Sequence, residues 1–522
     1  MAEEDLIFGK NRHFFGGIEP SNMVKFEARK RTTSSVNITA ILPEDTIIDG
    51  QTLCTVKGAV IRAKEGEYPK DEFDGVLVAD IEESGSFVAE MPETTEGWYY
   101  AAFPYSAQGV YNRNKANRSA ASKHYLFGYD LVNATANPST RVTYPSDVDN
   151  AAYTPAGMDY TADEFNYGSW GYDAGETFMP RPCMLKYDGT VDHYLNPNDY
   201  TKKVDGSASS AADASFGGNA MMEWSKIYTK RWEENGVYHF RCSDEPHGDG
   251  WDCWCNYDIN NKVIDHFYTA IYLVGGTNGK VRSISSINSD FPASPSSNNY
   301  SANVQCAQAN GSDWYIEVLA DRLLIQDLLV MMARSTDSQT AYGKGASQIK
   351  SGGTMDTKGM FWGDQNWSGV KVFGMEHLWG ALWRYTAGWM LANKVQKVKL
   401  TRGTHDGSTA TDYNTTGSGY ISVSDANLSS TGHISAMKTE SYGRLPKTLS
   451  GSSSTYEIDY VQVGSSASNS TYMAYCGGVV TDSNDIGGLF FAMMSYTVDI
   501  RFPSSSRNTV QAALSCKPRA TT

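Results

Sequence analysis

The stretch that organises the chain reads GMEHLWGALWRYTAGW, residues 374–389, the densest cluster of large aromatic side chains in the sequence. Apolar residues in its first half recur every four positions, as on one face of a helix, whereas Trp383, Tyr385 and Ala387 follow every second position, as on a strand. Gly380 lies where the spacing changes, and a glycine relaxes the backbone at such a point. The sequence therefore predicts a short helical turn that runs into a buried strand.

The aromatic side chains of this stretch are interpreted as core residues. Each one hides about 150–250 Å² of surface when it is buried. We expect Trp379, Trp383 and Trp389, together with Phe490, in the structural core of the protein. The alternative for the same pattern is a cage of aromatic rings around a ligand.

Length and composition limit the fold class. The chain has 522 residues, of which 40% are hydrophobic, 12% aromatic and 20% charged, with 48 glycines and 32 tyrosines. This length exceeds one ordinary hydrophobic core and allows roughly two to four domains. The composition is that of a globular protein rich in strands and loops rather than a helical bundle. We predict a mainly β protein with an α+β part.

Charge and hydropathy exclude several partners. Forty-four Lys and Arg against 59 Asp and Glu give a formal net charge of −15, which repels phosphate backbones and anionic membrane surfaces. The longest basic cluster, residues 25–31, is short and is interpreted as a solvated face. No apolar run is long enough to span a membrane, and residues 1–5 are acidic where a signal peptide is basic. We expect no nucleic acid, no membrane and synthesis in a cytoplasm.

Motifs of catalysis and metal binding are absent from the sequence. Its eight cysteines form no C-x-x-C pair, so we expect reduced thiols and neither a disulfide scaffold nor a zinc site. No Gly-x-Ser-x-Gly, Walker loop or H-E-x-x-H motif occurs. Glu376-His377 within the aromatic stretch is interpreted as part of the core. We predict no catalytic residue, no metal site, no cofactor and no enzymatic activity.

The N-terminal segment, residues 1–25, contains Phe14 and Phe15 but no sustained periodicity, which predicts an extended arm. Such an arm has too few apolar residues to bury itself. The functional hypothesis is a docking peptide that attaches the protein to a larger assembly through Phe14 and Phe15. The alternative is a frayed terminus.

Residues 26–122 are predicted to form a β-sandwich. Short strand-like runs are separated by turn-forming pairs, namely Asp49-Gly50, Tyr68-Pro69 and Asp74-Gly75. These intervals are typical of a sandwich of about one hundred residues. The segment resembles an immunoglobulin or fibronectin type III module, with Trp98-Tyr99-Tyr100 similar to its late aromatic strand. A polar stretch at residues 112–125 marks the domain boundary.

Two features stand out in the remaining segment, residues 123–522. Apolar residues recur at helical intervals from Trp314 to Ala333 after Ser312-Asp313, which predicts a capped helix packed against a sheet. Residues 401–470 are rich in Gly, Ser, Thr, Asn and Asp, and are predicted to form a polar surface insertion that carries binding loops.

The same segment resembles phage tail-fibre and receptor-binding proteins that end in a C-type-lectin fold. The resemblance rests on residues 137–144, 186–191, 195–203 and 280–285, and on the aromatic stretch, which is similar to the G-N-V-W-E-W signature shared by formylglycine-generating enzymes and phage variable proteins. Ala381, Arg384 and Tyr385 replace Asn, Glu and the second Trp of that signature. Polar contacts of those three positions are therefore not carried over.

The resemblance implies a virion protein that binds a host cell-surface glycan or protein through its C-terminal domain. It further implies a homotrimer attached to other virion proteins through the N-terminal arm. The main alternative is a structural head fibre or a capsid decoration protein. A formylglycine-generating-type enzyme is disfavoured, because that activity needs a paired-cysteine site. The calcium motifs E-P-N and Q-P-D of lectin-type folds are missing, so no metal is predicted.

The resemblance places the ligand surface on the C-terminal strands. If Phe490 packs inward, as the matching phenylalanine does in the resembling family, strand alternation turns Phe491 and Met493 outward. Exposed aromatic, Met and Arg side chains favour binding. The predicted ligand-binding residues are Asp482, Asn484, Phe491, Met493, Tyr496, Asp499 and Arg501. The alternative is that Phe491 and Met493 pack under the polar insertion and bind nothing.

Overall fold

The computed structural model describes residues 18–520, except 31–34, 92–96, 121–124, 172–177, 259, 274, 278, 286–299, 348–351, 401–416, 465–469, 479–486 and 496–509. The fold is mainly β, with 45% strand and 7% helix. The chain divides into two compact units, residues 1–125 and 126–522. The boundary lies close to residue 122, where the sequence places it.

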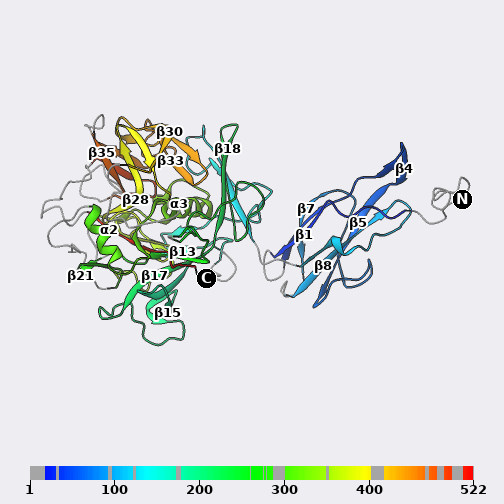
Figure 1. The fold of residues 1–522 in the computed structure, drawn as a ribbon, viewed down its shortest axis with the longest axis horizontal. Coiled ribbons are helices and arrows are strands. Elements are labelled where there is room, and N and C mark those ends of the chain that lie inside the picture. Colours follow the sequence, from blue (N-terminus) through cyan, green and yellow to red (C-terminus); the bar gives the residue numbers. More distant parts are fainter. Residues whose placement is uncertain are drawn as a thin grey trace, which may run out of the picture. The chain divides into compact units, whose positions relative to one another are not determined.

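The N-terminal unit consists of antiparallel sheets around one core (Figure 1). One sheet has the order β1 (Lys25–Lys30), β2 (Ser35–Ile41), β7 (Gly85–Glu90), and the other has the order β6 (Val76–Ile81), β5 (Val56–Glu65), β8 (Trp98–Ser106), β9 (Arg118–Ala120). A hairpin of β3 (Thr46–Ile48) and β4 (Gln51–Cys54) joins β2 to β5, and the short helix η1 (Lys115–Asn117) precedes β9. Ile38, Ile61 and Tyr100 from the two sheets are each 0% exposed and share the core.

The strand-like runs of the sequence, at residues 36–38, 53–56, 58–62, 76–78 and 98–103, fall in β2, β4, β5, β6 and β8, whereas β1, β3, β7 and β9 were missed. The basic cluster at residues 25–31 is not only a solvated face, because β1 runs through it and buries Ala28 completely. The predicted arm also ends earlier than residue 25. Asn112 Nδ2 donates to the Pro20 carbonyl at 2.8 Å, and the Met23 amide donates to Asn117 Oδ1 at 2.9 Å. Phe14 and Phe15 lie outside the described residues.

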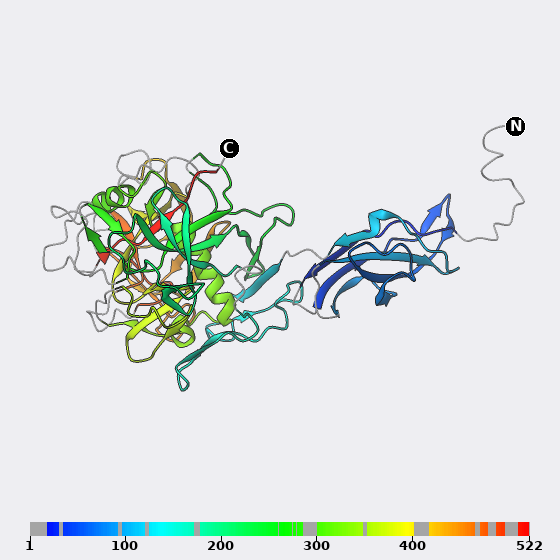
Figure 2. The same ribbon diagram turned by 90° about the horizontal axis from the view of Figure 1, so that it is seen from below.

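Three sheets hold most of the strands of the described part of the C-terminal unit (Figures 1 and 2). The first has the order β11 (Val142–Thr143), β10 (Leu126–Val132), β19 (Val237–Ser243), β18 (Tyr228–Glu234). The second has the order β16 (Asp199–Lys203), β15 (Val191–Asn196), β14 (Arg181–Lys186), β17 (Gly218–Ser225), β20 (His266–Ala270), β38 (Leu514–Cys516), β23 (Trp314–Ile316). The third has the order β30 (Ile421–Asn427), β29 (Val395–Val398), β28 (Trp383–Ala392), β35 (Thr471–Cys476), β36 (Ala492–Met494), β34 (Tyr460–Val463), β31 (Gly432–His433), and β37 (Val510–Gln511) pairs with β28.

Smaller elements complete this unit. The strands are β12 (Gly157–Asp159) with β13 (Glu164–Asn166), β21 (Gly275–Thr277) with β22 (Lys280–Arg282), β32 (Ala436–Glu440) with β33 (Gly443–Thr448), and β26 (Ser368–Val372) with β24 (Gly345–Ala346), β25 (Trp362–Gly363) and β27 (Met375–Glu376). The helices are α2 (Tyr300–Gln308), α3 (Leu319–Ala333) and α4 (Ser338–Tyr342). None of the helices in the described part of the chain is long and apolar enough to cross a membrane.

The predicted long helix begins later than its periodicity indicates. Residues from Trp314 to Ile316 form strand β23, which pairs with β38, and α3 starts at Leu319. Its N-cap is Val318, which makes no side-chain capping bond, so Ser312-Asp313 is not the cap. The helix ends where Arg334 adopts a left-handed conformation with φ 49°. Sheet pairing with β38 therefore overrides the helical spacing of the first residues.

The aromatic stretch contains the predicted strand but not the predicted helical turn. Strand β28 covers its second half, whereas the first half holds β27, which pairs with the preceding β26, followed by turns. His377 and Ala381 have φ angles of 53° and 60°, which a right-handed helix does not allow. Trp379, Trp383 and Trp389 are 0%, 3% and 4% exposed. These indoles lie in the core, as the sequence predicts.

The prediction of a surface insertion at residues 401–470 is wrong for its described part, residues 417–464. This part forms strands β30 to β34, and β30, β31 and β34 belong to the third sheet. Ile434, Leu445 and Val461 are 0% exposed. The few apolar residues of the segment are almost all used for packing, so a polar average composition conceals a set of strands.

Candidate functional site

The predicted surface on the C-terminal strands is wrong for the two residues that the structure describes. Phe491 is 1% and Met493 is 3% exposed. Strand β36 lies between β35 and β34 inside the third sheet, and all three of its residues are buried, so both of its faces are covered. The Phe491 ring lies 5.0 Å from the Trp383 ring and stacks on Tyr460 at 6.1 Å. Phe490 is also buried, at 4% exposed, whereas the other predicted ligand-binding residues, Asp482, Asn484, Tyr496, Asp499 and Arg501, lie outside the described residues.

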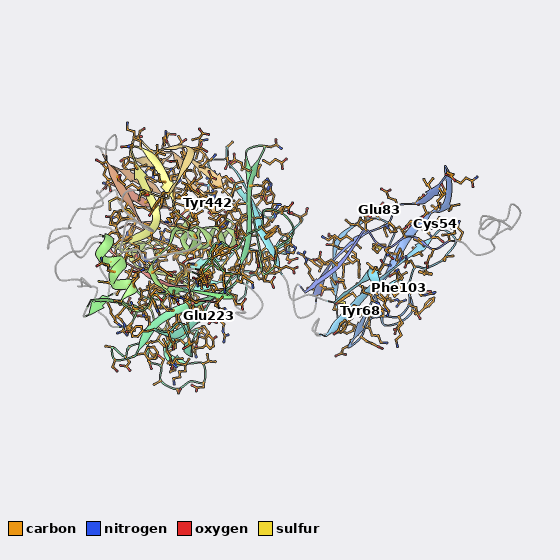
Figure 3. All side chains as sticks on the ribbon, viewed as in Figure 1. Cys54, Tyr68, Glu83, Phe103, Glu223 and Tyr442 are labelled. Atoms are coloured by element: carbon orange, nitrogen blue, oxygen red, sulfur yellow. The ribbon has the colours of Figure 1, made fainter. Side chains whose placement is uncertain are left out.

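The structure instead shows a surface groove of about 890 Å³ between the β18–β19 hairpin and the β32–β33 hairpin. Figure 3 labels Tyr442, which lies in the turn between β32 and β33. The groove is lined by Asn133, Arg231, Trp232, Glu233, Asn235, Gly236, Ala436, Met437, Lys438, Thr439, Glu440, Ser441, Lys447 and Thr448. A volume of this size accommodates a small ligand. We take the groove as the candidate ligand site.

Turn chemistry and packing fix the two walls. Asn235 and Gly236 have φ angles of 52° and 75°, the conformation of a two-residue hairpin turn that an Asn-Gly pair favours. Thr439 Oγ1 donates to Glu233 Oε2 at 3.0 Å across the groove. Trp254 Nε1 donates to the Ser441 carbonyl at 3.1 Å and holds the tip of the β32–β33 hairpin. The groove is therefore a preformed feature of two hairpins that are joined by hydrogen bonds.

The chemistry of the groove is mainly polar. Amide, carboxylate, ammonium and hydroxyl groups on its lining both donate and accept hydrogen bonds. Trp232 also borders the groove, but strand alternation puts its ring on the face opposite Arg231 and Glu233, where it stacks on His239 at 4.6 Å with an interplanar angle of 16°. This stack fixes the orientation of the indole. Such a lining suits a ligand with many hydroxyl groups better than an apolar one.

A network of buried charges supports the groove from behind. Arg231 Nε donates to Asp327 Oδ2 of α3 at 2.7 Å, and both side chains are almost fully buried. Tyr129 Oη and Tyr238 Oη both donate to Asp327 Oδ1, at 2.7 and 3.1 Å. The carboxylate of Asp327 thus ties strands β10, β18 and β19 to the helix. The wall that carries Trp232 and Glu233 is therefore held on a rigid base.

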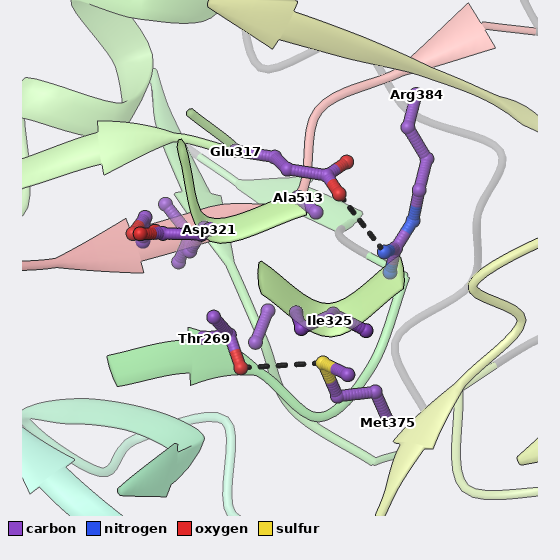
Figure 4. Close-up of a pocket in the computed structure, with 10 residues that line it drawn as sticks. Thr269, Glu317, Asp321, Ile325, Met375, Arg384 and Ala513 are labelled. Carbon is purple, nitrogen blue, oxygen red and sulfur yellow. Dashed lines mark hydrogen bonds and ion pairs between the residues drawn. The ribbon is translucent and has the colours of Figure 1, made fainter. Parts of the chain in front are cut away.

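A second polar site lies in the interior, where α3, β20, β28 and β38 meet (Figure 4). It is a cavity of about 10 Å³ lined by Thr269, Ala270, Glu317, Asp321, Ile325, Met375, Arg384, Ala513, Leu514 and Ser515. Arg322 Nη1 donates to Glu317 Oε1 at 3.0 Å, whereas Arg384 Nη1 lies 3.9 Å from the same oxygen. The cavity is too small for an organic substrate.

Another buried cluster fixes the segment before β25. Lys371 is 0% exposed and donates from Nζ to the Met355 carbonyl at 2.8 Å, while Glu376 accepts the amides of Gly353 and Met355 at 2.9 Å each. Burial lowers the pKa of Lys371 and raises the pKa of Glu376. These contacts explain Glu376 as a structural residue, as the sequence predicts for Glu376-His377. In the described part of the chain, no group of three or more His, Cys, Asp or Glu side chains is placed to hold a metal ion.

Asp459 gives the unit a pH dependence. It accepts the Phe490 amide at 2.7 Å, and burial raises its pKa from 3.8 to about 8. Since the folded-state pKa lies above the unfolded value, the stability that this carboxyl contributes is full below about pH 4 and is lost as pH rises through about 8. We expect Asp459→Asn, which keeps an acceptor for the Phe490 amide, to remove this loss. Urea unfolding at pH 5 and pH 8 measures the change in stability for the unsubstituted protein and for Asp459→Asn. An equal pH dependence in these two proteins would refute the role of Asp459.

Sequence reasoning named no single residue of the groove, although the groove residues on the β32–β33 hairpin lie in the segment 401–470, where it expected binding loops. One detectable signal was Asn235-Gly236 between two strand-like runs, which indicates a hairpin. Nothing in the sequence pairs that hairpin with the β32–β33 hairpin about two hundred residues later. No protein-family model and no curated protein matches this chain.

Proposed function

We propose that this protein is a phage virion fibre protein that binds a host cell-surface ligand with its C-terminal unit. The observation that carries the proposal is the preformed polar groove between the two hairpins. The resemblance to phage receptor-binding proteins supplies the biological context. Because the lining offers hydrogen-bonding groups of both kinds, a glycan is favoured over an apolar protein surface as the ligand.

The two-unit organisation supports this proposal. The N-terminal unit, with its three- and four-stranded antiparallel sheets around one core, suits the immunoglobulin-like or fibronectin type III-like spacer. In the C-terminal unit, helix α3 packs against β28, as expected for a C-type-lectin fold. The segment that contains Phe14 and Phe15 is proposed to attach the fibre to other virion proteins, and the fibre is proposed to be a homotrimer. Light scattering on the purified protein tests the trimer.

A binding role also agrees with the state of the cysteines. All eight are buried free thiols. Cys476 and Cys516, which a paired-cysteine site would need, lie on β35 and β38 in different sheets, and burial raises the pKa of both thiols. This environment supports recognition rather than thiol chemistry.

Replacing two charged groove residues by alanine is expected to weaken the binding of the protein to host cells. The double variant Lys438→Ala with Glu440→Ala removes an ammonium and a carboxylate from β32 without changing the net charge. The loss of two charged hydrogen-bonding groups is expected to reduce the affinity of the purified protein for host cells by about tenfold or more. Flow cytometry with labelled protein measures this affinity for host cells.

The matched control is Lys57→Ala with Glu82→Ala, an exposed ion pair of the N-terminal unit at 3.6 Å. This control is expected to bind host cells normally. Equal binding by the groove variant and the control would remove the groove as the ligand site. Cryo-electron microscopy of the particle separates the tail-fibre proposal from a head fibre or capsid decoration protein.

A further inference from the structure

Trp232 is a half-buried indole on β18, the edge strand of the first sheet (Figure 1). It lies opposite His239 of β19, and the two rings stack at 4.6 Å with an interplanar angle of 16°. The imidazole therefore covers one face of the indole. On the other side of β18, the single bridge between Thr229 and Asp252 is the one backbone pairing among the described residues. The second face of the indole is therefore not covered by a paired strand.

Charged side chains hold this indole in place. The Arg241 guanidinium lies 5.3 Å and the Lys230 ammonium 5.7 Å from the centre of the ring, within the range in which a cation attracts an aromatic face. Asp130 fixes two of the neighbours, because its Oδ1 atom lies 2.8 Å from Arg241 Nη1 and 2.8 Å from His239 Nδ1. The ring is thus oriented before any ligand binds, which lowers the entropic cost of binding.

Lys230 and Glu234 flank the indole along β18. Strand alternation puts these two side chains and the indole on the same face of the sheet, with about 7 Å between alternate residues. Neither side chain forms an ion pair with a described residue, and Glu234 is exposed. An aromatic surface therefore has a hydrogen-bond donor on one side and an acceptor on the other. The two free charges cancel, so this arrangement suits a neutral hydroxylated ring better than an ion.

We propose that the indole of Trp232 is a second saccharide subsite, on which one neutral sugar ring of the host glycan stacks. The groove residues Arg231 and Glu233 point to the opposite face of β18, whereas Trp232 borders the groove from the outer face. A glycan of several sugars occupies the groove and crosses the edge of β18 to reach the indole. The inference rests on the proposed function, because it takes the ligand to be a glycan. Linking two subsites in this way raises the overall affinity.

Binding of full-length variants to host cells tests the subsite. Trp232→Ala is expected to weaken binding about tenfold, whereas Trp232→Phe, which keeps an aromatic ring, is expected to stay within about threefold of the unsubstituted protein. The matched control is Trp362→Ala, which removes another half-buried indole with a lysine ammonium 4.6 Å from its ring. This control is expected to bind normally. Circular dichroism establishes that each variant is folded.

The outcomes separate the subsite from the groove. If folded Trp232→Ala binds normally while Lys438→Ala/Glu440→Ala does not, the subsite is overturned and the groove stands. If both variants bind like the unsubstituted protein, both sites are overturned.

Oxidation of the unsubstituted protein by hydroxyl radicals, read by mass spectrometry, provides a test that needs no variant. The purified surface polysaccharide of the host is expected to protect Trp232 from oxidation and to leave Trp362 unchanged. Unchanged oxidation of Trp232, at a polysaccharide concentration that blocks binding of the protein to cells, would overturn the subsite. A polysaccharide that does not compete with cells at all would overturn the glycan assignment and the subsite together.

Discussion

Replacing Trp379 or Trp383 by alanine is expected to lower the free energy of unfolding of the C-terminal unit by about 3–5 kcal/mol, the range for large buried aromatic residues. Trp379 is 0% exposed, and its Nε1 donates to the Gly343 carbonyl at 3.0 Å. Trp383 is 3% exposed, and its ring packs at 5.0 Å from Phe491. Either change leaves a cavity in the packing around β28. Urea denaturation followed by circular dichroism measures the loss.

Trp362→Ala is the matched control for these variants. The Trp362 side chain is half-buried. Its Nε1 atom donates an exposed hydrogen bond to Asp163 Oδ1 at a distance of 2.8 Å. Its loss is expected to lower the free energy of unfolding by only about 1 kcal/mol, the value of one hydrogen bond. Equal effects of Trp379→Ala and Trp362→Ala would contradict the placement of the aromatic stretch in the core.

Glu457→Gln is expected to have an effect of the same size for an electrostatic reason. Glu457 is 1% exposed and forms ion pairs with Arg141 at 3.0 Å and with Arg444 at 3.1 Å. Both arginines are almost fully buried, so removal of the shared carboxylate leaves two guanidinium charges without this partner. Breaking a buried ion pair from one side lowers the free energy of unfolding by about 3–5 kcal/mol.

The control for Glu457→Gln is Asp313→Asn, which breaks the exposed pair between Asp313 and Arg519. An exposed ion pair contributes about 0–1 kcal/mol, and high salt reduces it further. The same urea titration compares the two variants at low and high salt. If Glu457→Gln unfolds at the urea concentration of the unsubstituted protein, the buried network does not hold the C-terminal unit together.

The sequence predicts the core more completely than it predicts the surface. The alternation of Trp383, Tyr385 and Ala387 correctly placed β28, because a strand face with two large aromatic side chains has to be buried wherever it lies. The same alternation could not place Phe491 and Met493. Alternation assigns these two residues to one face but does not show that β36 is covered on both faces, which depends on neighbours far away in the chain.

The groove could not be predicted for a similar reason. Glu233 and Thr439 meet across it at 3.0 Å although they are 206 residues apart in the chain. Polar side chains carry no periodic signal, and the β32–β33 hairpin lies in a segment whose average composition resembles a loop. Tertiary pairing of two hairpins creates the site, so local patterns indicate at most that each hairpin exists.

Competition with the virus tests the central claim most directly. Host cells are incubated with the purified full chain, and the adsorption of phage particles that carry this protein is then counted. If the protein is the receptor-binding fibre, saturating protein blocks adsorption, the Lys57→Ala/Glu82→Ala control blocks it equally well, and the Lys438→Ala/Glu440→Ala variant does not. Undiminished adsorption in the presence of saturating, folded protein would contradict a role in host recognition.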